Sequence, residues 1–261
     1  TMDHLSRGRF IAGIGASGPQ VVEGWYGQPY SRPLERTREY VNIMRQIFAR
    51  EDTVGFEGKH FQLPFPHGTG LGKPLKSTVH PYRKDIPIYL AAEGPKNVAL
   101  SAEICDGWLP LFFAPKDNQF YKDALQSGMD VGGRNNWDDF EIAAMCSLIP
   151  GADVEDCANK IRPMLALYVG GMGAKGKNFH FDVFVRMGFE AECDKIQQLY
   201  LSGNKAEAIA AVPLEMCEAV ALLGPPSKIK DELALWEESV VNTLLISGPP
   251  QLLEFAADLV S

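Results

Sequence analysis

The sequence predicts a parallel α/β fold, because short apolar runs alternate with helical patterns along most of the chain. The five expected strands are residues 9–15, 86–92, 108–113, 140–149 and 241–247. The run at 86–92 is continuously apolar, which is typical of a parallel strand that helices cover on both faces. The length of 261 residues suits a single (β/α)8 barrel, which averages about 250 residues. Five strands, however, are fewer than a closed barrel needs.

Helices are expected between these strands. The first residues resemble the end of a helix, with Gly8 at the position after a helix where glycine is favoured. A helix from Pro33 to about Arg50 has a proline in its first turn and places Val41 and Phe48 on one buried face. Further helices are expected at residues 95–105, 118–128, 153–168, 226–238 and 250–260.

Two segments interrupt the alternation. Residues 51–85 mix aromatic residues with glycine and proline, which favours a hairpin and a long excursion. Residues 170–213 predict an insertion that is mostly helical around 190–200 and 205–211. Because long loops in compact domains are often functional, we expect the excursion and the start of the insertion to wall a substrate pocket. The whole chain, 1–261, is interpreted as a single domain.

The charge balance excludes some classes of partner. The chain has 25 basic and 33 acidic residues, a net charge of −8, and no basic run exceeds Arg83-Lys84. This argues against nucleic acid or an anionic membrane as a partner, so we expect a small-molecule substrate. The sequence contains neither an apolar stretch of about 18 residues nor a signal-peptide pattern, which predicts a cytoplasmic enzyme.

The cysteines and histidines predict neither disulfides nor a metal site. The five cysteines are odd in number and widely spaced, without a C-x-x-C pair. The five histidines form no i, i+4 pair and no H-E-x-x-H motif. A G-x-S-x-G motif is absent as well, which removes the commonest hydrolase arrangement.

A glycine-rich segment follows the first expected strand. Residues Gly13–Gly18 match the G-x-G-x-x-G dinucleotide-binding motif. In that motif the third glycine lies in the first turn of a helix, whereas Pro19 and the stretch through Pro33 are expected to postpone the next helix. A second strand ending in an acidic residue at about 20 residues' distance is also missing. We therefore favour a ligand loop at the end of a barrel strand over a dinucleotide site.

The turn Glu93–Asn97 is a candidate anion site. Gly94 allows close approach to the backbone, the start of a helix offers unpaired N–H groups, and Lys96 adds positive charge. An ordinary helix start explains the same residues, with Pro95 at its favoured early position and Lys96 in solvent. The sequence leaves both interpretations open.

A second glycine-rich segment, Tyr168–Lys177, looks like a phosphate loop but lacks the G-K-[ST] ending. A transition from a helix to a loop is the favoured interpretation of this segment.

Taken together, four segments resemble the luciferase-like family of flavin and deazaflavin oxidoreductases, whose fold is a (β/α)8 barrel. The segments that carry the resemblance are Leu5–Phe10 with Gly13–Gly15, Ile88–Ala92, Ala102–Trp108 and Leu222–Pro226. Within the family, Ser17–Gly27 and Glu93–Asn97 are similar to a branch that uses coenzyme F420.

The resemblance aligns the first expected strand with barrel strand four. It thus implies a (β/α)8 TIM barrel that is incomplete at its N-terminus and contains strands four to eight. The catalytic histidine and the bulged strand that family members place in the first three strands cannot be assigned here. Glu23 is the nearest carboxylate after strand four and is our candidate catalytic acid.

The resemblance also implies a function. We expect an oxidoreductase that transfers a hydride between reduced coenzyme F420 and a small organic substrate, with the cofactor over the C-terminal ends of the strands. The candidate cofactor-binding residues are Ser17, Gly18, Gln20, Ala91, Ala92, Glu93, Gly94, Pro95, Lys96 and Asn97. The alternatives are an FMN-dependent monooxygenase of the luciferase type and a non-catalytic barrel remnant.

An incomplete barrel would expose the apolar edges of its sheet. We therefore expect either a preceding segment of the protein or a partner chain against the strands near 9–15 and 241–247. Separately, we expect the protein to be a homodimer.

Overall fold

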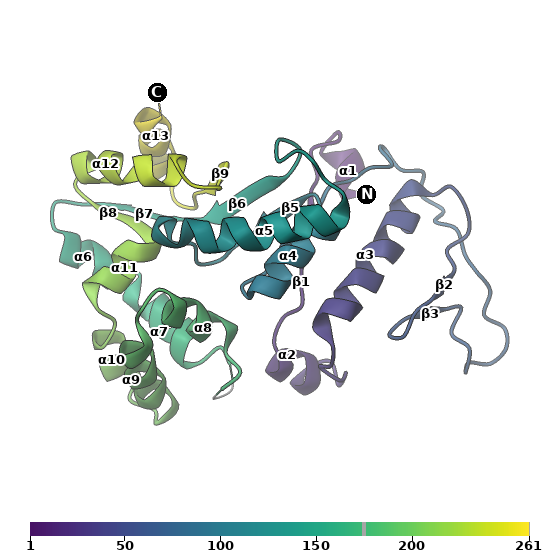
Figure 1. The fold of residues 1–261 in the computed structure, drawn as a ribbon, viewed down its shortest axis with the longest axis horizontal. Coiled ribbons are helices and arrows are strands. Elements are labelled where there is room, and N and C mark those ends of the chain that lie inside the picture. The colour runs from purple at the N-terminus through teal and green to yellow at the C-terminus, as the bar shows by residue number, and fades with distance from the viewer. Residues whose placement is uncertain (174–175, 261) are drawn as a thin grey trace.

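A five-stranded parallel sheet forms the centre of the computed structural model, which describes residues 1–173 and 176–260 (Figure 1). In sheet order its strands are β1 (Ala12–Gly15), β4 (Ile88–Ala91), β5 (Gly107–Leu109), β6 (Glu141–Met145) and β9 (Thr243–Leu245). Each lies within or next to one of the five expected runs, so the predicted parallel α/β fold is confirmed. The sheet does not close into a barrel, since β1 and β9 form its two edges. The expected N-terminal incompleteness of the barrel stays a prediction.

The expected strand at 140–149 is wrong as a single element. It divides at Cys146 into β6, which pairs with β5 and β9, and β7 (Ser147–Pro150). β7 extends beyond the end of β9 and pairs instead with β8 (Ala221–Gly224) in a separate parallel pair. β8 is not among the expected strands, because its four residues directly follow the helix Leu214–Val220 and continue its apolar pattern.

Helices cover one face of the sheet, the face to which Ile88, Leu90 and Trp108 point. They include α3 (Pro33–Ala49), α4 (Pro95–Ile104), α5 (Asn118–Gly132), α12 (Pro226–Glu237) and α13 (Pro250–Leu259). The fully buried Trp108 lies at the centre of this core, and its indole N–H donates a 2.8 Å hydrogen bond to the carbonyl of Ala92. A bidentate ion pair from Arg38 to Glu103 ties α3 to α4. These contacts hold the loop after β4 in place.

The excursion at 51–85 contains the expected hairpin, formed by β2 (Phe56–Glu57) and β3 (Gln62–Leu63). The carboxylate of Glu39 on α3 accepts hydrogen bonds of 2.8–3.0 Å from three consecutive N–H groups in the hairpin turn. The expected helix end at the N-terminus is also confirmed: α1 (Met2–Leu5) is followed by Gly8 at a φ of 80°.

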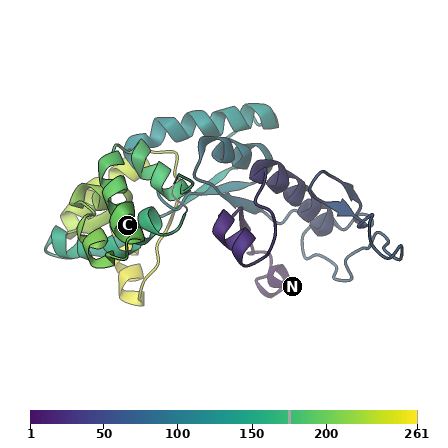
Figure 2. The ribbon, with the colours of Figure 1, turned by 90° about the horizontal axis from the view of Figure 1, so that it is seen from below.

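The insertion is helical and builds a second apolar cluster beside the sheet (Figure 2). Its helices are α8 (Phe179–Arg186), α9 (Glu190–Leu201) and α10 (Lys205–Ala210). The next helix, α11 (Leu214–Val220), follows the insertion and packs in the same cluster. The helix expected at 153–168 is wrong as one element, because it divides into α6 (Val154–Asn159) and α7 (Arg162–Gly170). Pro163 lies at the start of α7, where its missing N–H is tolerated, whereas an interior proline would break a continuous helix.

Strand β8 joins the two apolar clusters. Leu222 belongs to the cluster between the sheet and its helices, while Ala221 and Leu223 belong to the cluster of the insertion. The prediction of a single domain is not tested by this arrangement. Among the described residues, no helix combines the length and the apolarity that a membrane crossing requires.

Candidate functional site

Two of the predicted loops lie together at the C-terminal edge of the sheet. β1 and β4 are parallel neighbours, and their last residues, Gly15 and Ala91, are paired in register. The chain segments that follow them therefore start side by side. In a parallel α/β fold this edge is where ligands bind.

The loop after β1 differs from the expectation. A short helix, α2 (Pro19–Gly24), begins directly after Gly18, so the prediction that no helix starts before Pro33 is wrong. Pro19 serves as the first residue of this helix, which the fixed backbone angle of proline favours. Ser17 is exposed at a φ of 57°, and its carbonyl accepts a hydrogen bond from the Tyr30 hydroxyl.

Two further candidates in this region are exposed. Gln20 lies in the first turn of α2. The carboxylate of Glu23 accepts a 3.1 Å hydrogen bond from the backbone N–H of Tyr30, and so helps to close the loop after α2. Nothing in this geometry tests a catalytic role for Glu23, which stays a prediction.

The end of β4 presents one alanine to the edge and buries the other. Ala91 is exposed, whereas Ala92 belongs to the core and uses its carbonyl to accept the hydrogen bond from Trp108. A ligand at this edge would therefore meet Ala91 rather than the side chain of Ala92.

The start of α4 has the features of an anion-binding helix end. Gly94 is the N-cap, and a Cβ placed on it would meet no atom within 4 Å. Pro95 follows at the first helical position, and Lys96 is exposed. The Oδ1 atom of Asn97 is buried and has no hydrogen-bond partner among the described residues. Pro95 has no N–H, and the N–H of Asn97 bonds to the carbonyl of Gly94. A negatively charged group at this end would therefore meet the backbone N–H of Lys96, the Lys96 ammonium and the positive end of the helix dipole.

Glu93, directly before this helix start, points into the protein. One carboxylate oxygen, Oε1, accepts a 3.2 Å hydrogen bond from the backbone N–H of Leu111. The other, Oε2, is buried and has no partner among the described residues. Burial raises the pKa of Glu93 to about 8. The carboxyl group is therefore mostly protonated at neutral pH.

His180 on α8 faces this carboxyl group. Its Nδ1 lies 3.9 Å from Glu93 Oε1, beyond hydrogen-bond distance. The imidazole ring packs edge-on against Tyr168 and Phe112, with ring centroids 4.8 and 5.8 Å away. Burial lowers the pKa of His180 to about 4, so a neutral imidazole faces a neutral carboxyl at neutral pH.

Arg186, at the end of α8, completes the cluster. Its Nη2 donates a 2.9 Å hydrogen bond to the backbone carbonyl of Glu93, and its guanidinium lies over the ring of Phe120 at 5.3 Å. Its Nε is buried without a partner among the described residues. The insertion is thus attached to the loop after β4 through Glu93.

His180 and Arg186 are not among the site residues predicted from the sequence. They lie on an unpredicted helix, and no spacing pattern links them to the loop after β4. The segment Tyr168–Lys177 is partly outside the described residues, at positions 174 and 175. In its described part, a Cβ on Gly170 or Gly171 would lie 2.5 Å from Tyr200, so close helix packing requires both glycines.

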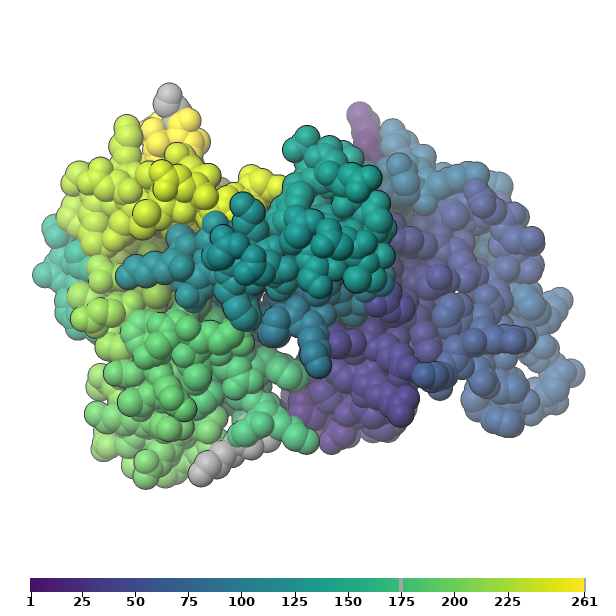
Figure 3. All heavy atoms as spheres, viewed as in Figure 1, coloured from purple at the N-terminus to yellow at the C-terminus, as the bar shows by residue number. Residues whose placement is uncertain are grey.

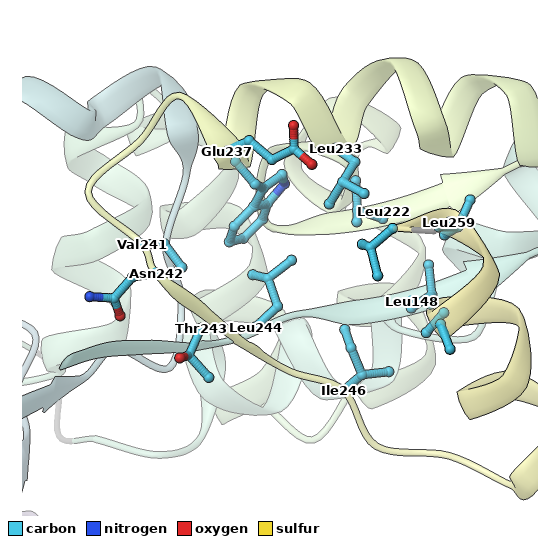
Figure 4. A pocket seen from close by; sticks show the side chains of 14 residues that line it. Leu148, Leu222, Leu233, Glu237, Val241, Asn242, Thr243, Leu244, Ile246 and Leu259 are labelled. Carbon is cyan, nitrogen blue, oxygen red and sulfur yellow. The ribbon is translucent and has the colours of Figure 1, made fainter.

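Two hollows in the structure lie away from this cluster. One of about 410 Å³ is apolar and lies between β8, β9, α12 and α13, where Leu222, Leu244 and Ile246 line it (Figure 4). Another, of about 350 Å³, is polar and includes Tyr89 and Glu141. Neither contains a predicted site residue. No group of three or more metal-binding side chains is found within residues 1–173 and 176–260.

Comparison with known proteins defines the class. The family described as luciferase-like monooxygenase matches residues 1–243, so this chain belongs to that family. A protein of Mycobacterium tuberculosis, provisionally named a coenzyme F420-dependent oxidoreductase, is 48% identical over 251 residues, which are 95% of this chain and 72% of that protein. The 5,10-methylenetetrahydromethanopterin reductase of Archaeoglobus fulgidus is 28% identical, over 96% of this chain and 70% of its own.

Solved structures show the same fold. The coenzyme F420-dependent tetrahydromethanopterin reductase of Methanopyrus kandleri superposes with a TM-score of 0.75 at 22% identity, covering 94% of this chain and 70% of that chain. An F420-dependent secondary alcohol dehydrogenase gives a TM-score of 0.67 at 17% identity, over 94% of this chain and 66% of that chain.

Proposed function

We propose that this protein is an oxidoreductase that transfers a hydride between coenzyme F420 and a small organic substrate. The observation that carries the proposal is the start of α4, where the open space at Gly94 and the exposed Lys96 lie at the C-terminal edge of the parallel sheet. The F420-dependent relatives support the choice of cofactor.

The residues at this edge fit such a cofactor. Open space at Gly94 lets a phosphate group approach the backbone, and the backbone N–H and the ammonium group of Lys96 would hold it. Ser17, Gly18 and Ala91 would contact its remaining part from the neighbouring strand ends. When bound, the deazaflavin supplies the hydride chemistry. The protein binds, orients and shields it, and helix α8 covers the edge from one side.

We expect the excursion 51–85 and the start of the insertion to wall the substrate pocket. The hairpin of the excursion lies beside α3 at the opposite end of the molecule from the insertion helices, and α2 lies nearer to the insertion (Figure 1 and Figure 3). This assignment of the pocket, the identity of the substrate, the homodimer and the cytoplasmic location remain predictions. Light scattering of the purified protein tests the dimer.

Equilibrium titration with F420 and with FMN, followed by fluorescence, tests the proposed cofactor. We expect tighter binding of F420. One neighbour of the same fold, with a TM-score of 0.57 at 15% identity, is a monooxygenase solved with FMN. Equal or tighter FMN binding would therefore favour the monooxygenase alternative, and binding of neither cofactor would favour the non-catalytic one.

Two variants test the phosphate position. Lys96→Ala should weaken F420 binding by about 1–2 kcal/mol, the scale of a charged hydrogen bond, and reduce its dependence on salt. Gly94→Val should weaken it more, because the side chain would occupy the space that a phosphate needs. Melting temperatures close to that of the wild type would show that both effects are on binding. Unchanged affinity in both variants would place the phosphate elsewhere.

A further inference from the structure

An acidic residue lies where the proposed function requires an anion. Glu93 immediately precedes Gly94, the N-cap of α4. If its carboxyl group were ionised, its negative charge would repel a phosphate at the same helix end. Because the side chain is only 12% exposed, little water would screen this repulsion.

The positive charge of Arg186 lowers the pKa of this carboxyl group, but burial raises it and has the larger effect. Arg186 on α8 is engaged with the backbone carbonyl of Glu93 and the ring of Phe120, not with the carboxyl oxygens. His180, also on α8, lies at 3.9 Å in an aromatic environment that disfavours its charged form. The Leu111 N–H provides one neutral hydrogen bond.

The remaining titratable groups around Glu93 do not change this balance. Tyr121 on α5 and Asp117, in the short 3-10 helix Pro115–Asp117, both lie in the field of Arg186, and neither adds positive charge. Lys96 is exposed on α4. The stable state of the Glu93 carboxyl in this surrounding is the neutral one, because ionisation would leave a buried, unpaired charge.

We propose that Glu93 is a positioning residue that controls anion affinity at the start of α4 through its own ionisation: the helix end binds an anion while Glu93 is protonated and loses affinity when Glu93 releases its proton to solvent. This inference rests on the proposed function, which supplies the anion. By thermodynamic reciprocity, a bound anion makes Glu93 harder to ionise by the same factor. Since its pKa is about 8, the change in affinity falls in the mildly alkaline range.

The test compares the wild type with Glu93→Gln, which keeps the shape of the side chain and cannot ionise. Binding of F420 and of inorganic phosphate is measured from about pH 6 to about pH 9.5. Across this range the anion affinity of both proteins is compared at each pH. The loss of affinity in the wild type should exceed the loss in Glu93→Gln by a factor on the order of ten. The two proteins meet the same anion, so any titration of the anion itself cancels in the comparison.

Glu103→Gln provides a matched control, because Glu103 lies at the opposite end of α4 and pairs with Arg38. It should keep the pH dependence of the wild type. An infrared difference spectrum between wild type and Glu93→Gln at neutral pH reports the Glu93 group directly and should show a protonated carboxyl.

The outcomes separate this inference from the proposed function. Identical pH profiles for wild type and Glu93→Gln, or an ionised Glu93 at neutral pH, overturn the inference while F420 binding still supports the function. Phosphate binding with the expected pH dependence, but without F420 binding, overturns the function and supports the inference. Failure of both anions to bind at any pH overturns both.

Discussion

The replacement Glu93→Gln should make the protein more stable, and by an amount that grows with pH. In the unfolded chain Glu93 has its ordinary pKa of 4.5, whereas in the folded protein burial raises it to about 8. Between these values the folded state holds a proton that the unfolded state has released. The free energy of unfolding therefore decreases as the pH rises through this window.

The magnitude follows from the proton linkage. Each pH unit inside the window costs the wild type about 1.4 kcal/mol, and a glutamine at position 93 does not pay this cost. Between about pH 5 and about pH 7 the stability of Glu93→Gln relative to the wild type should rise by on the order of 3 kcal/mol. Any contact that the new amide loses or alters changes the stability difference equally at the two pH values. The change of that difference with pH therefore reports only the titration of Glu93.

Urea denaturation at several pH values, in a range where unfolding is reversible, measures this slope. The neighbouring His180 is present in both proteins, and its own titration largely cancels in the difference. Parallel stability curves for wild type and Glu93→Gln would refute the reasoning, since they would mean that folding does not change the proton affinity of Glu93.

Three further predictions concern stability. Because burial lowers the pKa of His180 from 6.5 to about 4, His180→Phe should gain stability over the wild type as the pH falls through that window, by on the order of 2 kcal/mol at about pH 5 in urea denaturation. Gly128→Ala should cost about 1–3 kcal/mol in thermal denaturation, because its Cβ would overlap a carbonyl of α4, while Gly18→Ala, which meets open space, should change little. A hydrogen bond from Lys59 is the main reason why the pKa of Glu35 is lowered to about 2, so the wild type loses stability as the pH falls from 4.5 toward 2. In an acid titration Glu35→Gln should lose less stability than the wild type. An equal loss in the two proteins would contradict this role of Glu35.

Local sequence patterns determined most of the architecture. The five strands and the helix α3 were predictable because each has a local pattern of apolar residues that is typical of its type. The hairpin was predictable from the aromatic residues, glycines and prolines of residues 51–85. The elements that were missed are those whose local pattern is ambiguous. β8 continues the apolar pattern of α11, and the helix α2 starts at a proline that resembled an interruption.

The candidate site was only partly predictable for a related reason. The loops after β1 and β4 carry glycines and a lysine whose chemistry is visible in the sequence, and the order of motifs indicated the family. The contact between Glu93 and Arg186 joins residues 93 positions apart, and no periodicity connects them. In the sequence Glu93 is an ordinary charged residue before a helix. Only the tertiary structure places Glu93 under α8 and away from water. Its charge is then decided by desolvation, which depends on all the surrounding elements together.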